Sequence, residues 1–312
     1  MTSFEASFSA WLKSKASVLD DACGEAMQDG LAGLSGPDLE AANQSINNLY
    51  FEKGPGKAFR ERDCDYSLPG IGPLYTGHWH GKRVHEALAV LMPLRAALSG
   101  RPMNVIDVGA GTDAVLWAWT MIACFVNSHD SPPYPVHSWT SIDSSQEMIA
   151  QSDRLWTRLC AVLPEAERVV KRQPPLWADW RKPRSLPANA IVLGSYLFSK
   201  SDADTSRRTA PAFAAFLKNA RAVSVVLWTT KNKRGVLDRT RTELAGWWDV
   251  TPQILFDCPL KGKMRRCLAV MEDVADSLSI AKDAQWDSRF NWGLAPLHTW
   301  LLAMTASKVE NL

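Results

Sequence analysis

The chain has 312 residues, a formal net charge of +2 and 46% hydrophobic residues. This composition is typical of a globular protein with one large domain, or a domain and an appendage. The near-neutral charge excludes a strong overall attraction to nucleic acid or membranes, and no apolar run is long enough to span a bilayer.

The N-terminus has no basic region followed by an apolar core, so we expect no signal peptide and a cytoplasmic protein. The six cysteines are scattered and form no Cys-x-x-Cys pair. This spacing favours free, mostly buried thiols over a zinc or iron–sulfur centre, and we expect no metal.

Residues 1–100 are predicted to be mainly helical. Phe4, Phe8 and Trp11 recur at helical spacing, and residues 35–38 form a helix-start signal with an early proline. Breakers fill residues 54–73, which we interpret as an ordered loop, and residues 84–98 suggest a further helix.

Two histidines, His78 and His80, interrupt this helical region. On a strand, residues two apart face the same side, which metal binding can use. The alternatives are a pocket lining and plain packing or solvent exposure.

The chain is organised around residues 104–114. Val105, Ile106 and Val108 predict a short buried strand, and Gly109 and Gly111 mark a tight turn. The apolar residues from 114 to 121 have the spacing of a helix that lies on a sheet. Strand, glycine turn and helix open a nucleotide-type α/β fold, and the alternative is the same unit without a ligand.

The α/β pattern continues along the chain. Further strands are predicted at residues 137–143, 169–172, 187–199 and 223–228, with a final hairpin at 251–258 and 264–271 and a partly helical tail at 286–304. Ser131-Pro132-Pro133-Tyr134 looks like motif IV of amino-methyltransferases, but it precedes the second strand rather than following the fourth, so we interpret it as a rigid loop.

An apolar strand that carries Asp107 and ends in Gly109-Ala110-Gly111 resembles motif I of the class I S-adenosylmethionine (SAM) methyltransferases. The resemblance implies an α/β fold with a Rossmann-like seven-stranded methyltransferase sheet and an N-terminal helical cap. It divides the chain into the cap at 1–100, a SAM-binding core at 101–275 and an aromatic segment at 276–312 that packs on the core or the cap.

Residues 107–111, 142–148, 192–199 and 235–237 together resemble the ribosomal small-subunit-associated methyltransferase-like family. Three features depart from that family. Asp113 replaces a usual glycine, although an acid suits a helix start. Trp228 stands where an acid is common, and the cysteine cluster of the family is missing.

The resemblance also implies a set of SAM-binding residues. Asp143 ends the second strand, where a carboxylate accepts both ribose hydroxyls, and its alternative role is helix capping. Asp179 would meet the adenine amino group, and its alternative is a loop acid near Arg181. The complete predicted set is Asp107, Gly109, Ala110, Gly111, Asp143, Ser144, Met148, Asp179, Gly194 and Ser195.

Ser195 and Tyr196 leave the fourth strand where methyl and acceptor should meet, so they are the predicted catalytic residues. Tyrosine is a poor base near its ordinary pKa, which favours an orienting role for Tyr196. The alternative is that Tyr196 packs inward.

The sequence therefore predicts a SAM-dependent methyltransferase with a small-molecule acceptor. The basic loops at residues 231–234 and 261–266 favour RNA or a ribosomal particle as the alternative acceptor. A third class is a SAM-fold ribosome assembly factor without catalysis. No membrane partner is expected.

Overall fold

The computed structural model describes residues 3–47, 64–98, 104–129, 136–182, 186–195, 203–230, 242, 248–251, 255–280, 282, 286–293 and 299–306. The chain divides into two compact units. Unit 1 comprises residues 1–82, 145–162 and 259–294, and unit 2 comprises residues 83–144, 163–258 and 295–312.

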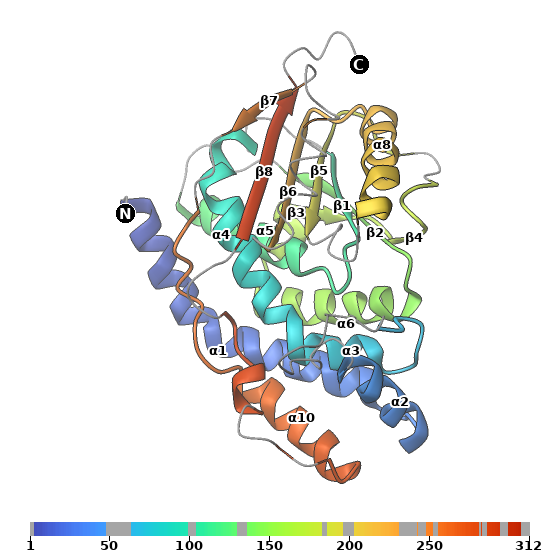
Figure 1. Ribbon diagram of the computed structural model, residues 1–312. Coiled ribbons are helices and arrows are strands. Elements are labelled where there is room, and N and C mark those ends of the chain that lie inside the picture. Colours follow the sequence, from blue (N-terminus) through green and yellow to red (C-terminus); the bar gives the residue numbers. More distant parts are fainter. Residues whose placement is uncertain are drawn as a thin grey trace, which may run out of the picture. The chain divides into compact units, whose positions relative to one another are not determined.

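Unit 2 is an α/β unit whose described residues form one sheet of eight strands (Figure 1). The strands are β1 (Asn104–Val108), β2 (His137–Asp143), β3 (Val170–Arg172), β4 (Leu176–Trp177), β5 (Ala190–Ser195), β6 (Ser224–Thr230), β7 (Trp248–Thr251) and β8 (Thr299–Ala306). Their order is β3-β2-β1-β5-β6-β8-β7, and β4 pairs with β2. The pairs from β3 to β6 are parallel, whereas β8 runs antiparallel to both β6 and β7.

The sheet reverses its direction of growth at β1. The chain first adds β2 and β3 on one side of β1, and then adds β5 and β6 on the other. In parallel α/β sheets, ligands bind at the carboxyl ends of the strands at such a switch point. The loop after β1 and the end of β5 therefore mark the expected binding edge.

The two faces of this sheet carry different side chains. Helix α8 (Ala203–Asn219) covers one face (Figure 1), where Phe213 and Phe216 join Ile106, Val192 and Leu227 in one buried core cluster. Since successive strand residues alternate between faces, Asp107, Leu193 and Trp228 belong to the opposite face. Helix α5 (Ala114–His129) packs on that face through Trp119, which contacts His137 and Trp139.

Unit 2 also contains the short helix α7 (Ala166–Val169), and it takes in α4 (Gly81–Leu98) from Arg83 onward. Every residue of α5 from Ala114 to Val126 is buried. A helix that is apolar all round in this way is one that lies inside the protein.

Unit 1 is helical. It contains α1 (Ser3–Leu31), α2 (Gly36–Asn47), α3 (Ile71–Tyr75), the π-helix η1 (Thr76–His80), α6 (Gln146–Val162), α10 (Arg265–Ser277) and the short η3 (Asp287–Arg289). Arg158 of α6 forms ion pairs of 2.7 Å with both Glu25 and Asp29 of α1. Helix α3 approaches α6 closely at Gly72, where an added Cβ would lie 2.7 Å from the Glu147 carbonyl oxygen.

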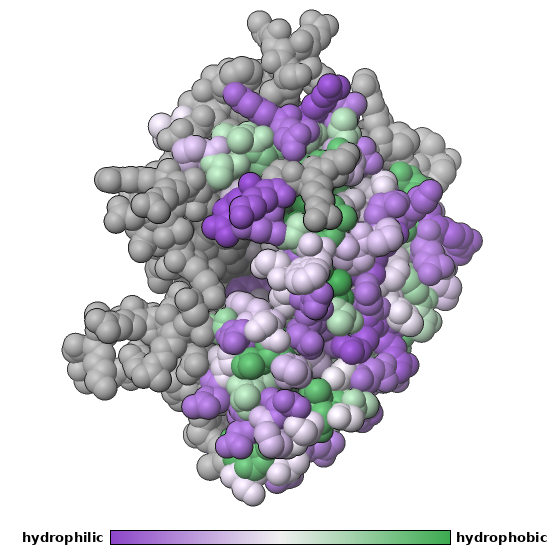
Figure 2. Space-filling model, turned by 90° about the vertical axis from the view of Figure 1, so that its right-hand side faces the viewer, coloured by the Kyte–Doolittle hydropathy of each residue, from purple (hydrophilic) through white to green (hydrophobic). Residues whose placement is uncertain are grey.

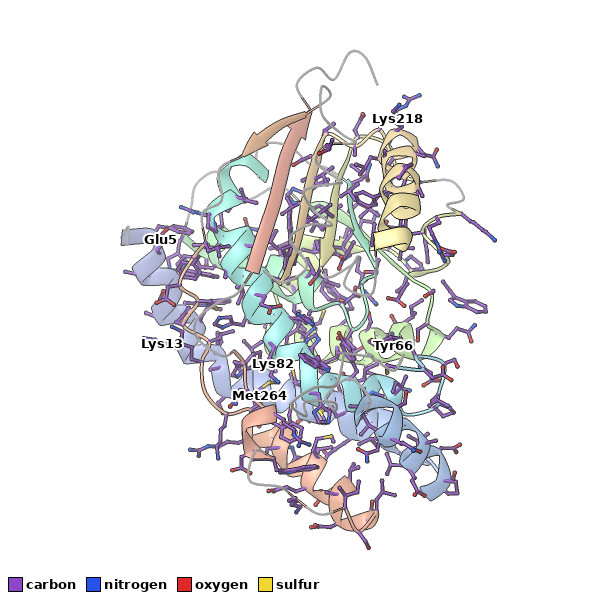
Figure 3. The ribbon with its side chains drawn as sticks, in the orientation of Figure 1. Glu5, Lys13, Tyr66, Lys82, Lys218 and Met264 are labelled. Carbon is purple, nitrogen blue, oxygen red and sulfur yellow. The ribbon has the colours of Figure 1, made fainter. Side chains whose placement is uncertain are left out.

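The predicted final hairpin at residues 251–258 and 264–271 is wrong, since the structure has β7 at Trp248–Thr251 and no strand at residues 255–258. Residues 264–271, expected to form a strand of the final hairpin, begin helix α10, and Met264 (Figure 3) is its N-cap. The antiparallel strand is instead β8, in the tail expected to be partly helical. Among the described residues the sheet has eight strands rather than seven, because the two-residue strand β4 pairs with β2.

Large hydrophobic side chains are seldom exposed among the described residues. Those that are exposed are Val18, Val136, Leu176 and Trp177, and on the face seen in Figure 2 hydrophilic residues predominate. The prediction of cysteines outside disulfides, most of them buried, is confirmed, since none of the six forms a disulfide and five are buried.

Candidate functional site

The loop after β1 folds against the end of β2. Gly109 and Gly111 have φ angles of 67° and 57°, in the left-handed region that glycine adopts without strain. The Gly109 amide donates to the Ile142 carbonyl at 2.9 Å, and the Gly111 amide donates to Oδ2 of Asp143 at 2.8 Å. The structure thus brings together the predicted residues of the glycine loop and Asp143.

Asp107 presents the strongest electrostatic anomaly of this edge. Its side chain is completely buried, and neither carboxyl oxygen has a hydrogen-bond partner. Burial raises the pKa of Asp107 well above its ordinary value, and the nearby Asp113 and Asp143 raise it further. An unpartnered buried carboxyl is costly, so this site suits a cationic ligand or one rich in hydrogen-bond donors.

Asp113 occupies the position of the missing glycine and adopts φ 59°, which is rare for a side-chain-bearing residue. Two neighbouring strands hold its carboxylate. Ser141 of β2 donates a hydrogen bond to Oδ1 at 2.6 Å, and Arg172 of β3 forms an ion pair with Oδ2 at 3.1 Å. These contacts, which the sequence did not suggest, fix the loop in place of a glycine.

Trp177 is a neighbour of Asp143 that sequence analysis missed. The two residues are partners in the pairing of β2 with β4, and the Trp177 side chain donates its Nε1 hydrogen to the Ser144 carbonyl at 3.0 Å. The residue is 63% exposed, an unusual exposure for an indole. The sequence offered one signal, since Trp177 comes two residues before the predicted site residue Asp179.

Helix capping after β2 is performed by Ser145. Its Oγ accepts a hydrogen bond from the Met148 amide at 3.1 Å and donates one to the Tyr66 carbonyl at 2.6 Å. Tyr66 is labelled in Figure 3. Oδ2 of Asp143 accepts a hydrogen bond from the Gly111 amide, so this carboxylate contacts the glycine loop. Met148 lies in unit 1.

Asp179 forms an ion pair with Arg181, which agrees with its alternative role as a loop acid near that arginine. The Arg181 guanidinium donates to both carboxylate oxygens, at 2.8 Å from Nε to Oδ1 and 2.8 Å from Nη2 to Oδ2. The hydrogen bonds from the Arg181 side chain lower the pKa of Asp179. An adenine contact at Asp179 stays a prediction.

The end of β5 carries the remaining predicted residues. Gly194 is buried, and Ser195 is half-buried with an Oγ that lacks a hydrogen-bond partner. Tyr196, the Ser131–Tyr134 motif and the basic loop at 231–234 lie outside the described residues. The predicted role of Tyr196 stays a prediction.

His78 and His80 lie on the π-helix η1 and not on a strand, so the strand geometry considered for a metal pair does not apply. Burial lowers the pKa of each imidazole to about 3, with Lys82 and Arg289 contributing at His78. Both side chains are therefore neutral at physiological pH. Within the described residues, no group of three or more histidines, cysteines and acids is placed to hold a metal.

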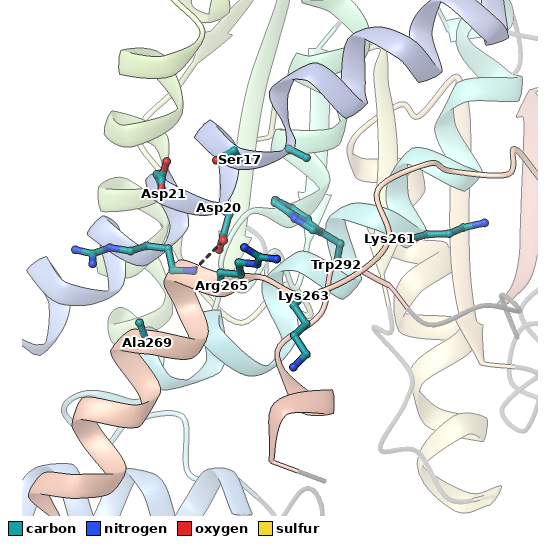
Figure 4. A pocket seen from close by; sticks show the side chains of 10 residues that line it. Ser17, Asp20, Asp21, Lys261, Lys263, Arg265, Ala269 and Trp292 are labelled. Carbon is teal, nitrogen blue, oxygen red and sulfur yellow. Dashed lines mark hydrogen bonds between the residues drawn. The ribbon is translucent and has the colours of Figure 1, made fainter.

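A separate hollow of about 580 Å³ lies in unit 1 (Figure 4). Its cationic residues are Lys261, Lys263, Arg265 and Arg266. Asp20 occupies the N-terminus of α10, where it accepts hydrogen bonds from the backbone amides of Arg266 at 2.9 Å and Cys267 at 3.3 Å. Lys263 contacts Asp287. The chain's own acids thus offset part of the positive charge here.

No family model matches the chain, and no curated protein matches it. Several solved structures of SAM-dependent methyltransferases are similar to this chain. The magnesium protoporphyrin IX methyltransferase of Synechocystis PCC 6803 with bound SAM is 9% identical, with coverage of 88% of this chain and 99% of that chain and a TM-score of 0.40.

A SAM-dependent methyltransferase from Geobacter sulfurreducens, in complex with S-adenosylhomocysteine, is 16% identical over 75% of this chain and 97% of that chain, with a TM-score of 0.43. The plantazolicin methyltransferase BpumL is 11% identical over 96% of this chain and 100% of that chain, with a TM-score of 0.41.

A search of the described helices for a membrane-spanning segment finds none with the required length and hydropathy.

Proposed function

We propose that this protein is a SAM-dependent methyltransferase with a small-molecule acceptor. The observation that carries the proposal is the buried, unpartnered carboxyl of Asp107 at the switch point of the sheet. SAM is a cation at its sulfonium, and its amino group supplies further hydrogen-bond donors. The antiparallel β8 supports the same class, since the last strand of the class I methyltransferase sheet also runs antiparallel.

The residues of this edge fit the parts of such a cofactor. Asp107 would hold the cationic end, and the glycine loop from Gly109 to Gly111 leaves room for close approach of the ligand. Asp143 stands at the end of β2, where its carboxylate would accept the ribose hydroxyls. Of the predicted set, Gly194 and Ser195 lie at the end of the strand next to β1.

When bound, SAM supplies a methyl group that its sulfonium has already activated. The protein then has to hold the acceptor close and aligned, and to exclude water. Ser195, at the end of β5, would help to orient the acceptor. Such chemistry requires no fixed set of proton-transferring residues.

Calorimetry with SAM tests the proposal. We expect the wild type to bind SAM, and Gly109→Arg to abolish binding because the new side chain would fill the loop. Gly33→Arg is the matched control, since Gly33 also has a positive φ, 80°, but has no atom within 4 Å of an added Cβ. Absence of binding by the wild type, or equal binding by Gly109→Arg, would refute the assignment.

One observation favours RNA or a ribosomal particle as the alternative acceptor, namely the cationic lining of the hollow in unit 1. A screen with labelled SAM against total RNA and a metabolite extract separates the two acceptor classes. RNA binding should weaken steeply with salt, whereas binding of an uncharged metabolite should not. A protein that binds SAM but methylates neither extract would support the assembly-factor class.

A further inference from the structure

Three buried polar groups without a hydrogen-bond partner lie along one face of the sheet. They are the carboxyl of Asp107, the Oγ of Ser195 and the indole Nε1 of Trp228. Ser195 and Trp228 are direct partners in the pairing of β5 with β6, and Asp107 is paired with Leu193, two residues before Ser195. Because side chains alternate along a strand, all three point to the face opposite α8.

An unpartnered buried group has lost its water without gaining a replacement, which makes such groups uncommon in native proteins. They also occur elsewhere among the described residues, for example at Thr120 and Trp286, so the informative feature of these three is their common placement. Here they occur in succession on three adjacent strands, β1, β5 and β6, and all lie toward the carboxyl ends. This is the edge where parallel α/β sheets bind ligands. A ligand that satisfies these groups explains the arrangement better than three independent losses.

A single unpartnered indole is less informative, as Trp119 shows. Its Nε1 also lacks a partner, but the ring packs edge-on against His137 and Trp139 near the start of β2. It therefore lies toward the amino ends of the strands, away from the binding edge. Trp119 provides an internal control for Trp228.

The chemistry of the pair defines the ligand. An indole N–H only donates a hydrogen bond, whereas a serine hydroxyl donates and accepts. Together they suit an oxygen that accepts from Trp228 and exchanges a second hydrogen bond with Ser195. The fully buried Leu193 and nearly fully buried Val226 make the surroundings apolar, and Asp107 disfavours an anion on the same face.

We propose that Ser195 and Trp228 form the polar end of the acceptor site, and that this site takes an uncharged molecule with a hydroxyl or carbonyl oxygen. The inference rests on the proposed function. It places the acceptor on the β5–β6 side of the switch point, while the glycine loop and Asp143 lie on the β1–β2 side. Trp228 stands where the resembling family commonly has an acid, so this position offers a neutral hydrogen-bond donor in place of a carboxylate.

Nuclear magnetic resonance of the full chain with ¹⁵N-labelled indoles tests the inference, with phenol as the hydroxyl probe. Loss of one signal in Trp228→Phe and of another in Trp119→Phe assigns the two Nε1–H resonances. We expect phenol to shift the Trp228 resonance saturably and to leave that of Trp119 unchanged. Ser195→Ala, which keeps the reporter, should weaken the apparent phenol affinity about three- to ten-fold, as for one lost hydrogen bond.

Benzene and benzoate are the matched probes. Benzene lacks the oxygen and benzoate carries a charge, so we expect neither to reproduce the phenol response. A Trp228 resonance that ignores phenol, or responds equally to benzene, overturns the inference, and tighter binding of benzoate overturns the class of ligand. If Trp228→Phe does not fold, Trp228→Tyr gives the assignment of the resonance. The Ser195→Ala variant tests the site in either case.

Titration of the same samples with SAM separates the two proposals. If SAM binds to the wild type while phenol leaves the Trp228 resonance unchanged, the acceptor site is refuted and the proposed function stands. If phenol binds but SAM does not, the proposed function fails. Trp228→Phe should bind SAM with the affinity of the wild type, and a loss of SAM affinity would assign Trp228 to the cofactor instead.

Discussion

Arg172 and Asp113 form a buried ion pair that fixes the loop after β1. Nη2 of Arg172 lies 3.1 Å from Oδ2 of Asp113, and the two side chains are only 10% and 1% exposed. The pair joins the third strand to a residue held at a positive φ. The conformational strain of Asp113 is therefore opposed by a charge that comes from another strand.

Removal of Arg172 should destabilise the protein strongly. In Arg172→Met the Asp113 carboxylate stays buried without this cation, and breaking such a pair costs about 3–5 kcal/mol. The free energy of unfolding from chemical denaturation measures the effect.

Asp113→Gly/Arg172→Met is the informative control. Glycine removes the buried charge and tolerates the positive φ, so the double variant should be more stable than Arg172→Met alone. If the two substitutions simply add, the ion pair does not hold the loop.

Replacement of Asp107 should separate stability from function. Asp107→Asn keeps a neutral polar group but removes the ionisable carboxyl, whose charged form is disfavoured by burial and by Asp113 and Asp143. The variant should therefore gain about 1.4 kcal/mol of stability over the wild type for each pH unit between the unfolded and the folded pKa of Asp107. The same change should abolish the affinity for SAM, because the cationic end loses its carboxylate. Thermal unfolding and calorimetry measure the two effects.

The pH dependence of stability provides a test that could contradict this prediction for Asp107. The folded pKa of Asp107 lies above the unfolded value, so the carboxyl favours folding most below the unfolded pKa and loses that contribution as the pH rises. The advantage of Asp107→Asn should therefore grow with pH, and the SAM affinity of the wild type should rise as Asp107 ionises. An advantage that shrinks with pH would show that Asp107 has a partner as an anion.

His78 and His80 should make the fold sensitive to acid. Each has a folded pKa of about 3, below the ordinary value of 6.5, so each favours folding fully above pH 6.5 and loses its contribution as the pH falls toward 3. Each histidine should remove about 1.4 kcal/mol of unfolding free energy per pH unit in that window. Unfolding curves of the wild type and His78→Phe, compared between pH 7 and pH 5, measure the difference; parallel pH profiles would contradict burial of a neutral His78.

Asp20 should stabilise unit 1 as the cap of α10. Asp20→Ala leaves two backbone amides of the first turn without their acceptor and should cost about 1–2 kcal/mol. Because burial raises the pKa of Asp20, Asp20→Asn should cost less, since its amide oxygen still accepts. Asp21→Ala, on the exposed neighbour, is the control for denaturation and should change stability by less than about 0.5 kcal/mol.

Short-range pattern was sufficient for β1, β2 and α5: the β-branched residues of β1 lead into Gly109 and Gly111, and prolines precede β2. It failed at residues 264–271 because the window was too short. Cys267, Val270, Met271, Val274 and Ala275 are all buried at helical spacing, but the last two lie beyond the stretch interpreted as a strand. β8 contains helix formers such as Leu301 and Leu302, and its pairing with β6 overrides that preference.

The candidate site shows the same division. The proximity of the glycine loop to Asp143 could be predicted from sequence, because the loop follows one predicted strand and Asp143 ends the next. The contact between Asp113 and Arg172 joins residues 59 positions apart, and no local pattern encodes it. The unpartnered nitrogen of Trp228 depends on the register of β5 with β6, which only the assembled sheet reveals.

The position of β8 has a consequence for synthesis of the protein. β8 lies between β6 and β7, yet it follows both in the chain, and β7 pairs with β8 in the described sheet. Until residues 299–306 have been synthesised, β6 therefore has an unpaired hydrogen-bonding edge, and its sequence contains two valines and a leucine. Such an edge invites pairing between chains. The nascent protein should depend on holding chaperones until residues 299–306 emerge, and truncation before them should yield aggregates.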